Sequence, residues 1–154
     1  MAQLQPYCAI EGNDDGLPVV FVHGMGVDHR SLMMLDKAFD GNDSIRRIYL
    51  DLPGFGRTPA LPEHACGLPE IADWLQTAID GLVGKAAPFA MVGNSMGGAL
   101  VREVLAREPR RVAGMALIAP VVDPQHAGRH VAEHVVAQPN PKLTHSLPQD
   151  QVFD

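Results

Sequence analysis

Three short runs of apolar residues constrain the fold of this chain more than any other feature of the sequence: Val19–Val22, Phe89–Val92 and Met115–Ala119. Each run is continuous instead of alternating with polar residues, which is typical of strands buried on both faces of a parallel sheet. We predict a further strand at Ile45–Leu50, nearer an edge because it contains two arginines, and a short one at Tyr7–Glu11.

Segments with helical periodicity lie between these runs. In Leu68–Val83 apolar residues recur at the spacing of an amphipathic helix, with Pro69 at its start and Gly84 after its end. Met96–Arg107 is a second predicted helix, and a third segment is predicted around Ser31–Phe39. Strands that alternate with helices at these lengths predict the α/β class, with an open, mostly parallel sheet and flanking helices.

The composition is that of a globular protein with an acidic balance. The 154 residues are 46% hydrophobic, and 12 Lys and Arg against 18 Asp and Glu give a formal net charge of −6. This balance lacks the basic patch typical of nucleic-acid binding, so we expect no nucleic-acid partner. No apolar run is long enough for a membrane span, no secretory signal is evident, and Cys8 and Cys66 make no disulfide framework. We therefore expect a cytoplasmic protein with no membrane partner.

The strongest functional signal is the segment Gly-Asn-Ser-Met-Gly-Gly that begins at Gly93, between a predicted strand and a predicted helix. A serine on such a sharp turn holds its hydroxyl clear of the backbone, and Gly93 and Gly97 are required because a Cβ there would crowd the turn. Ser95 would also lie at a helix N-terminus, where free N–H groups favour developing negative charge. We interpret Ser95 as a catalytic nucleophile, against the alternative of a glycine-rich turn with an incidental serine.

A second loop, His-Gly-Met-Gly, begins at His23, directly after the first apolar run. At the C-terminal end of a central strand, such a loop can turn a backbone N–H toward the serine of the neighbouring strand. We predict that the amides of Met25 and Met96 form an oxyanion hole with two donors. His23 and Gly24 are expected to support this loop, with His23 acting by hydrogen bonding instead of proton exchange.

A third motif, DLPGFGRT, begins at Asp51 and encodes a tight turn in which Asp51 is predicted to anchor the loop instead of acting as a catalytic acid. In this order and at these separations, VVFVHGMG, DLPGFGRT and GNSMGG resemble the motifs of the α/β-hydrolase family. The resemblance covers about residues 7–123. It implies an α/β-hydrolase type of sheet with the nucleophile strand at its centre and the oxyanion donors at Met25 and Met96.

The resemblance also implies a function. It makes Ser95 the nucleophile of a serine hydrolase that acts on a carboxylic ester or a related small acyl substrate, with no cofactor and no metal. The GNSMGG segment is similar to that of hydrolases that cleave carbon–carbon bonds in ring-fission products of aromatic compounds, and esterases share similar segments. An alternative hypothesis, outside the enzymes, is that the chain is a non-catalytic fragment with an interaction role.

The chain departs from the family's pattern after residue 123. In members of the family, this part of the chain is followed by a lid, further strands, an acid and the catalytic histidine. Since none of these is evident in this sequence, we expect an incomplete sheet in which the last strands are absent. Asp123 is an alternative acid, because it follows the last apolar run. Three histidines recur at i, i+4 and i+8 in the last segment: His126, His130 and His134. They could supply a general base, a metal site or the solvated face of a lid helix, and we favour the last.

We therefore divide the chain into an N-terminal portion of an α/β-hydrolase core, residues 1–123, and the start of a lid, an insertion or a tail, residues 124–154. Without a following strand, Met115–Ala119 would form an exposed apolar edge that invites pairing with another chain. From this we hypothesise that the chain is a fragment or a shortened product. If it folds, we expect it to form a homodimer through the exposed strand, to aggregate, or to cover this edge with its last segment; the other expected partner is the acyl substrate.

Overall fold

The computed structural model describes residues 4–123, and the segment predicted at 124–154 lies outside the described residues. Within the described part a five-stranded sheet has the strand order β1-β3-β2-β4-β5. β1 pairs antiparallel with β3, and the other neighbours pair in parallel, which confirms the predicted open, mostly parallel sheet. The strands are β1 (Cys8–Gly12), β2 (Leu17–Val22), β3 (Ile45–Leu50), β4 (Phe89–Asn94) and β5 (Val112–Ile118).

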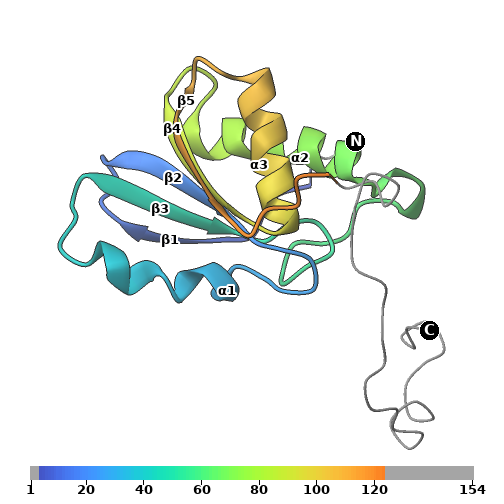
Figure 1. Ribbon diagram of the computed structural model, residues 1–154, viewed down its shortest axis with the longest axis horizontal. Helices are drawn as coiled ribbons and strands as arrows, with labels where there is room; N and C mark the ends of the chain where they lie inside the picture. The colour runs from blue at the N-terminus through green and yellow to red at the C-terminus, as the bar shows by residue number, and fades with distance from the viewer. Residues whose placement is uncertain (1–3, 124–154) are drawn as a thin grey trace, which may run out of the picture. The chain divides into compact units, whose positions relative to one another are not determined.

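The helices cover both faces of the sheet. α2 and α3 lie on one face and α1 lies on the other (Figure 1). α2 (Leu68–Val83) and α3 (Met96–Arg107) have the predicted bounds. The segment predicted as one helix around Ser31–Phe39 is instead α1 (Arg30–Met33) followed by a 3₁₀ helix, η1 (Asp36–Phe39); a second 3₁₀ helix, η2, spans Glu63–Ala65.

The alternation of side chains along β2 shows why the apolar runs are continuous. Val20 and Val22 belong to the core formed with α2 and α3, whereas Val19 and Phe21 belong to the core on the other face. All four side chains are buried, with relative exposures between 0% and 8%. The prediction that these strands are buried on both faces is therefore confirmed for β2 at the centre of the sheet, and it is wrong for β5, whose side chains are exposed in the described sheet.

β5 forms the outer strand of the described sheet, since β4 is its only neighbour there. Its apolar side chains are partly exposed, with 36% for Met115, 37% for Leu117 and 38% for Ile118. The strand starts at Val112 and ends one residue before the predicted end, because Ala119 has a left-handed φ of 43° and turns the chain away. The structure therefore shows the predicted apolar edge within residues 4–123.

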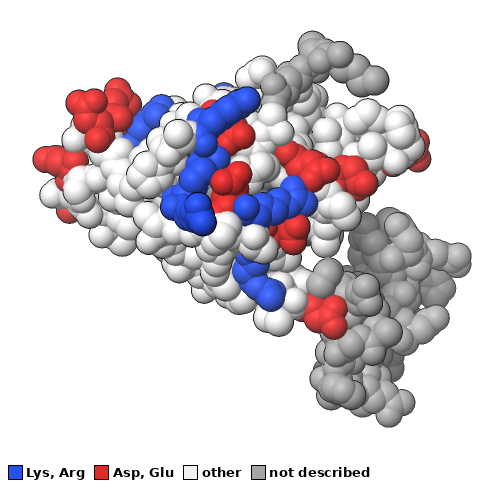
Figure 2. All heavy atoms as spheres, turned by 90° about the horizontal axis from the view of Figure 1, so that it is seen from above, with Lys and Arg blue, Asp and Glu red and all other residues white. Residues whose placement is uncertain are grey.

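In the middle of the face shown in Figure 2, basic and acidic groups lie next to one another, whereas acidic groups gather at its left end. Ion pairs of this kind join Arg107 to Asp73 at 2.6 Å and Arg111 to Asp80 at 2.7 Å. Of the helices in residues 4–123, none has the length and apolar character needed to cross a membrane.

Candidate active site

Ser95 occupies the single residue between the end of β4 and the start of α3. Its φ of 50° and ψ of −115° are unusual for a residue with a Cβ, and they match the strained strand-to-helix turn that presents a nucleophile. Hydrogen bonds from the end of the sheet hold this conformation. The Ser95 N–H donates to the Ile118 carbonyl oxygen at 3.0 Å, and the Ser95 carbonyl oxygen accepts from the Val121 N–H at 3.0 Å.

Two glycines allow α3 to start so close to the sheet. A Cβ on Gly93 would lie 2.6 Å from Cγ2 of Val101 and 2.7 Å from the Gly97 carbonyl oxygen. A Cβ on Gly97 would overlap the carbonyl oxygen of Val22 and would lie 2.5 Å from that of His23. Contacts this short are not tolerated, so the first turn of α3 can pack on the end of β2 only without these side chains.

The loop after β2 lies directly against the turn that carries Ser95. A Cβ on the buried Gly24 would lie 3.1 Å from the Ser95 Cβ and 3.0 Å from Oδ1 of Asn94. Met25 follows in this loop with a side chain that is 72% exposed, whereas Met96 is buried at the start of α3. The structure thus brings the two candidate oxyanion donors onto segments that adjoin the serine.

His23 is fully buried, and both of its ring nitrogens are engaged. Its Nδ1–H donates to the Gly24 carbonyl oxygen at 2.7 Å, and its Nε2 accepts from the Leu52 N–H at 3.0 Å. This pairing requires the neutral ring, and burial lowers the pKa of His23 below its usual value. His23 therefore joins the loop after β2 to the loop after β3 and has no free nitrogen for Ser95.

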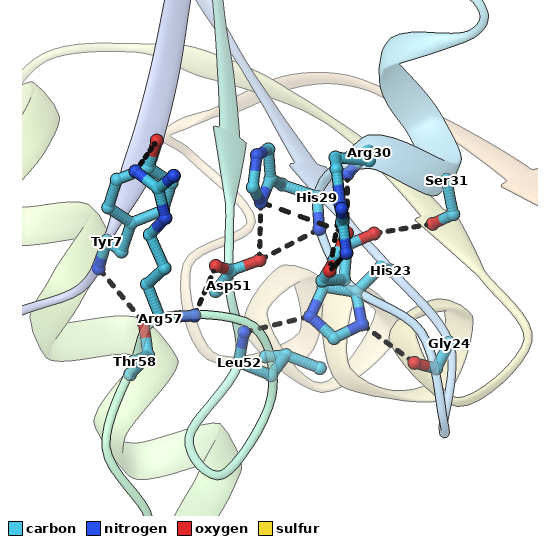
Figure 3. A network of polar contacts seen from close by, with 11 residues as sticks. Tyr7, His23, Gly24, His29, Arg30, Ser31, Asp51, Leu52, Arg57 and Thr58 are labelled. Carbon is cyan, nitrogen blue, oxygen red and sulfur yellow. Dashed lines mark hydrogen bonds and ion pairs between the residues drawn. The ribbon is translucent and has the colours of Figure 1, made fainter.

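Asp51 anchors the loops on either side of it, as predicted. Its carboxylate accepts three hydrogen bonds of 2.8 Å, from the N–H and the ring Nδ1 of His29 and from the N–H of Arg57 (Figure 3). The carboxylate is fully buried and fills the space where a side chain on Gly56 would stand, and Gly56 has a left-handed φ of 56°. A buried carboxylate needs such donors, so this pattern is that of a structural anchor.

Asp28, His29 and Asp51 bring possible ligand atoms within 4.8 Å of one another. Those atoms are already engaged, because the Arg30 guanidinium binds both carboxylate oxygens of Asp28 at 2.6–3.1 Å. The hydrogen bonds and charge of Arg30 lower the pKa of Asp28 to about 2. We therefore assign this cluster to loop anchoring, in line with the bonds that Asp51 makes.

Of the candidate acid and base residues for Ser95, Asp123 lies within the described residues and the three histidines of the last segment do not. Asp123, the alternative acid, is exposed and lies at the end of the described residues. His126, His130 and His134 lie outside them. Both ring nitrogens of His23 bond to other partners, so this ring is not placed to take the serine proton, and Nδ1 of His29 bonds to Asp51.

An apolar cavity of about 590 Å³ adjoins the site, and the sequence reasoning missed it. Met25 and Met96 form part of its wall, together with Phe55 and Leu61 from the loop after β3 and Ile71 from α2. One signal could have found it. The loops after β2 and β3 both leave the carboxyl edge of a parallel sheet, where the serine also lies, and ligands bind at this edge in open α/β sheets.

Known proteins with similar sequences include enzymes that act on esters or transfer acyl groups. The chain is 34% identical over 108 residues to the dihydrolipoyllysine-residue acetyltransferase component of the acetoin cleaving system of Pseudomonas putida, covering 70% of this chain and 28% of that protein. It is 31% identical over 131 residues to the pimeloyl-[acyl-carrier protein] methyl ester esterase of Hamiltonella defensa, covering 84% of this chain and 44% of that protein. The chain thus spans less than half the length of these relatives.

A solved structure shares the fold. An alpha/beta superfamily hydrolase from Oenococcus oeni superposes with a TM-score of 0.72 at 24% identity, covering 92% of this chain and 56% of that one. Residues 18–140 match the alpha/beta hydrolase fold family, and they include the sheet from β2 onward, the turn at Ser95 and the loop after β2. On this match, the chain belongs to the alpha/beta hydrolase fold family.

Proposed function

We propose that this chain carries the nucleophile and the oxyanion hole of a serine hydrolase that acts on a carboxylic ester. The observation that supports it most is the left-handed conformation of Ser95 between β4 and α3, with Gly24 packed against its Cβ. Backbone strain at a single residue needs a physical reason. A serine hydroxyl that must face a substrate at the N-terminus of a helix supplies one. The esterase among the curated relatives favours an ester over other acyl compounds.

In the proposed reaction, Oγ of Ser95 forms a bond to the carbonyl carbon of the ester while its proton passes to a base. The carbonyl oxygen becomes an oxyanion, which the N–H groups of Met25 and Met96 stabilise. The carbon–oxygen bond to the alcohol then breaks, and the alcohol leaves with a proton. Water attacks the acyl-serine in the same way and releases the acid. Every step at the carbonyl carbon thus uses the same two amides.

In the hydrogen-bonded network of residues 4–123 that Figure 3 shows, neither ring nitrogen of His23 is free to act as the base of this reaction, and Nδ1 of His29 is bound to Asp51. If the 154-residue chain brings no base to Ser95, its turnover should fall by roughly 10⁴- to 10⁶-fold relative to an assisted serine. Labelling of Ser95 depends on the same activation of the hydroxyl, but it also identifies the residue that reacts, which a turnover assay does not.

A fluorophosphonate probe that reacts with activated serines is the test. We expect the 154-residue chain to be labelled at Ser95 and the Ser95→Ala variant to lose the label. Ser44→Ala is the matched control, because Ser44 lies in an exposed turn and donates to Asn42 instead of facing the site. Mass spectrometry of the labelled peptide locates the phosphonate.

Two outcomes would contradict the proposal. Labelling that survives in Ser95→Ala would place the reactive group elsewhere. A folded chain that takes up no label would favour the non-catalytic reading. A burst of alcohol release from a nitrophenyl ester, equal to one equivalent of protein, would instead show that an acyl-serine forms.

A further inference from the structure

We infer that the cavity beside Ser95 binds the hydrocarbon chain of a neutral ester, and that Phe55, Leu61 and Ile71 set the length of chain that fits. This inference rests on the proposed function for the identity of the ester, but the binding itself needs no chemistry at Ser95. The cavity measures about 590 Å³, within the range of small-molecule sites.

The position of the cavity links it to the carbonyl carbon. Met25 and Met96 line it, and the amides of the same two residues are the proposed oxyanion donors. A carbonyl group held by those amides would therefore have its substituent at the mouth of the cavity. Phe55 and Leu61, half-buried in the loop after β3, and the buried Ile71 of α2 extend the apolar wall away from the serine.

The charge of the wall selects against an acid. Glu63 is the one charged side chain among the described lining residues, and no Lys, Arg or His lines the cavity in that part of the chain. With the hydrocarbon chain in the cavity, the carboxylate of an acid would lie at its mouth and would be repelled by the negative charge of Glu63, with no cation among the described lining residues. A neutral ester avoids this repulsion. The cavity should thus hold the substrate more tightly than the acid that hydrolysis releases.

Cys66 offers a direct report of occupancy. Its thiol is exposed at the cavity wall and contacts the Glu63 carbonyl oxygen at 3.1 Å. The other cysteine, Cys8, lies on β1 and is half-buried, and burial raises the pKa of its thiol, which lowers its reactivity. An alkylating reagent should therefore modify Cys66 first, and a molecule in the cavity should slow that reaction.

The experiment measures the rate at which iodoacetamide alkylates Cys66 in a Cys8→Ser background. Methyl esters of straight-chain acids, from butanoate to decanoate, serve as competitors. We expect protection that strengthens by about fourfold for each methylene that enters the cavity and then levels off when the cavity is full. The sodium salts of the same acids should protect less than the esters at equal chain length.

Three variants make the result specific. Leu61→Trp should fill the cavity, so that protection levels off at a shorter acyl chain. Leu61→Ala should enlarge the cavity, so that protection levels off at a longer acyl chain. Met34→Trp is the control for a large aromatic side chain, because Met34 is 77% exposed and lies outside the cavity wall. Circular dichroism shows which variants are folded, and the Leu61 position in a loop favours tolerance of both changes.

The outcomes separate this inference from the proposed function. Protection that is unchanged in Ser95→Ala supports the cavity as a binding site even if Ser95 takes up no fluorophosphonate. Labelling of Ser95 without any protection of Cys66, or equal protection by esters and acids of every length, would overturn the inference and leave the nucleophile in place.

Discussion

Gly97 shows how a single missing side chain permits the candidate active site. Its Cα lies so close to the end of β2 that a Cβ would overlap the Val22 carbonyl oxygen. Backbone atoms cannot move aside as a flexible side chain does. We therefore expect Gly97→Ala to lower the free energy of unfolding by about 2 kcal/mol or more, as overpacking does in well-packed cores.

Gly81→Ala is the matched control for this change. Gly81 lies in α2, is exposed, and a Cβ there would meet no atom within 4 Å. Since alanine favours a helix more than glycine does, Gly81→Ala should stabilise the chain by up to about 1 kcal/mol. Urea denaturation of both variants gives the comparison. Equal effects of the two substitutions would show that α3 does not pack on β2 as described.

His23 predicts a pH dependence of stability. In the folded chain burial lowers its pKa, whereas in the unfolded chain the ring titrates near the usual value of about 6.5. Below that pH the unfolded state binds more protons than the folded state. The free energy of unfolding should therefore fall as the pH falls from about 6.5 toward the lower folded pKa, and it should be constant above that window as far as this group is concerned.

The His23→Gln variant tests the assignment. It removes the titrating ring, so the slope of stability against pH below about 6.5 should decrease, although the variant should be less stable overall. His64→Gln is the control, because His64 lies exposed on η2 and makes no such pairing with another residue of 4–123. If the slope of stability against pH survived in His23→Gln and disappeared in His64→Gln, His64 and not His23 would cause the pH dependence.

Among the elements, the long amphipathic helices could be predicted to the residue. α2 and α3 each present one apolar stripe to the sheet, and Gly84 or the segment before Pro109 ends them, so local pattern and tertiary packing agree. The same agreement holds for β2 and β4. Their apolar runs are long enough to be buried on both faces, which only the centre of a parallel sheet provides.

The region after α1 could not be predicted from its own pattern. Asp36 begins η1, and its carboxylate accepts hydrogen bonds from Nε of Arg47 at 2.6 Å and from the Tyr49 hydroxyl at 2.9 Å, both on β3. Burial would raise the pKa of Asp36, but these bonds and the charge of Arg47 outweigh it and lower the pKa. Helical periodicity gives no sign of such partners, because they lie in another element.

In the molecule as a whole, the exposed edge of β5 is where we expect the 154-residue chain to associate. The strand contains no charged residue or proline. Within residues 4–123, one of its two edges pairs with β4 and the other has no neighbouring strand. We propose that a second copy pairs with this edge. Multi-angle light scattering should then give a mass above that of one chain, rising with concentration.

A lysine on the strand should weaken this association. Leu117→Lys places a charge on an apolar edge that is already 37% exposed, so it should favour the monomer with little loss of folding stability. Met34→Lys, on a side chain that is 77% exposed and outside β5, controls for net charge. A monomeric wild-type chain with a cooperative unfolding transition would contradict the proposed pairing.

Local patterns were enough to predict the elements and the order of the motifs, because apolar periodicity and glycine spacing are properties of neighbouring residues. They predicted the sheet, α2, α3 and the placement of Ser95 between β4 and α3. The contacts that the loops make, in contrast, are seen only in the folded chain. The bonds from His29 to Asp51, the neutral state of His23 and the cavity beside Met96 all join segments far apart in the sequence. Such contacts depend on where parallel strands end in space, and no local pattern records that position.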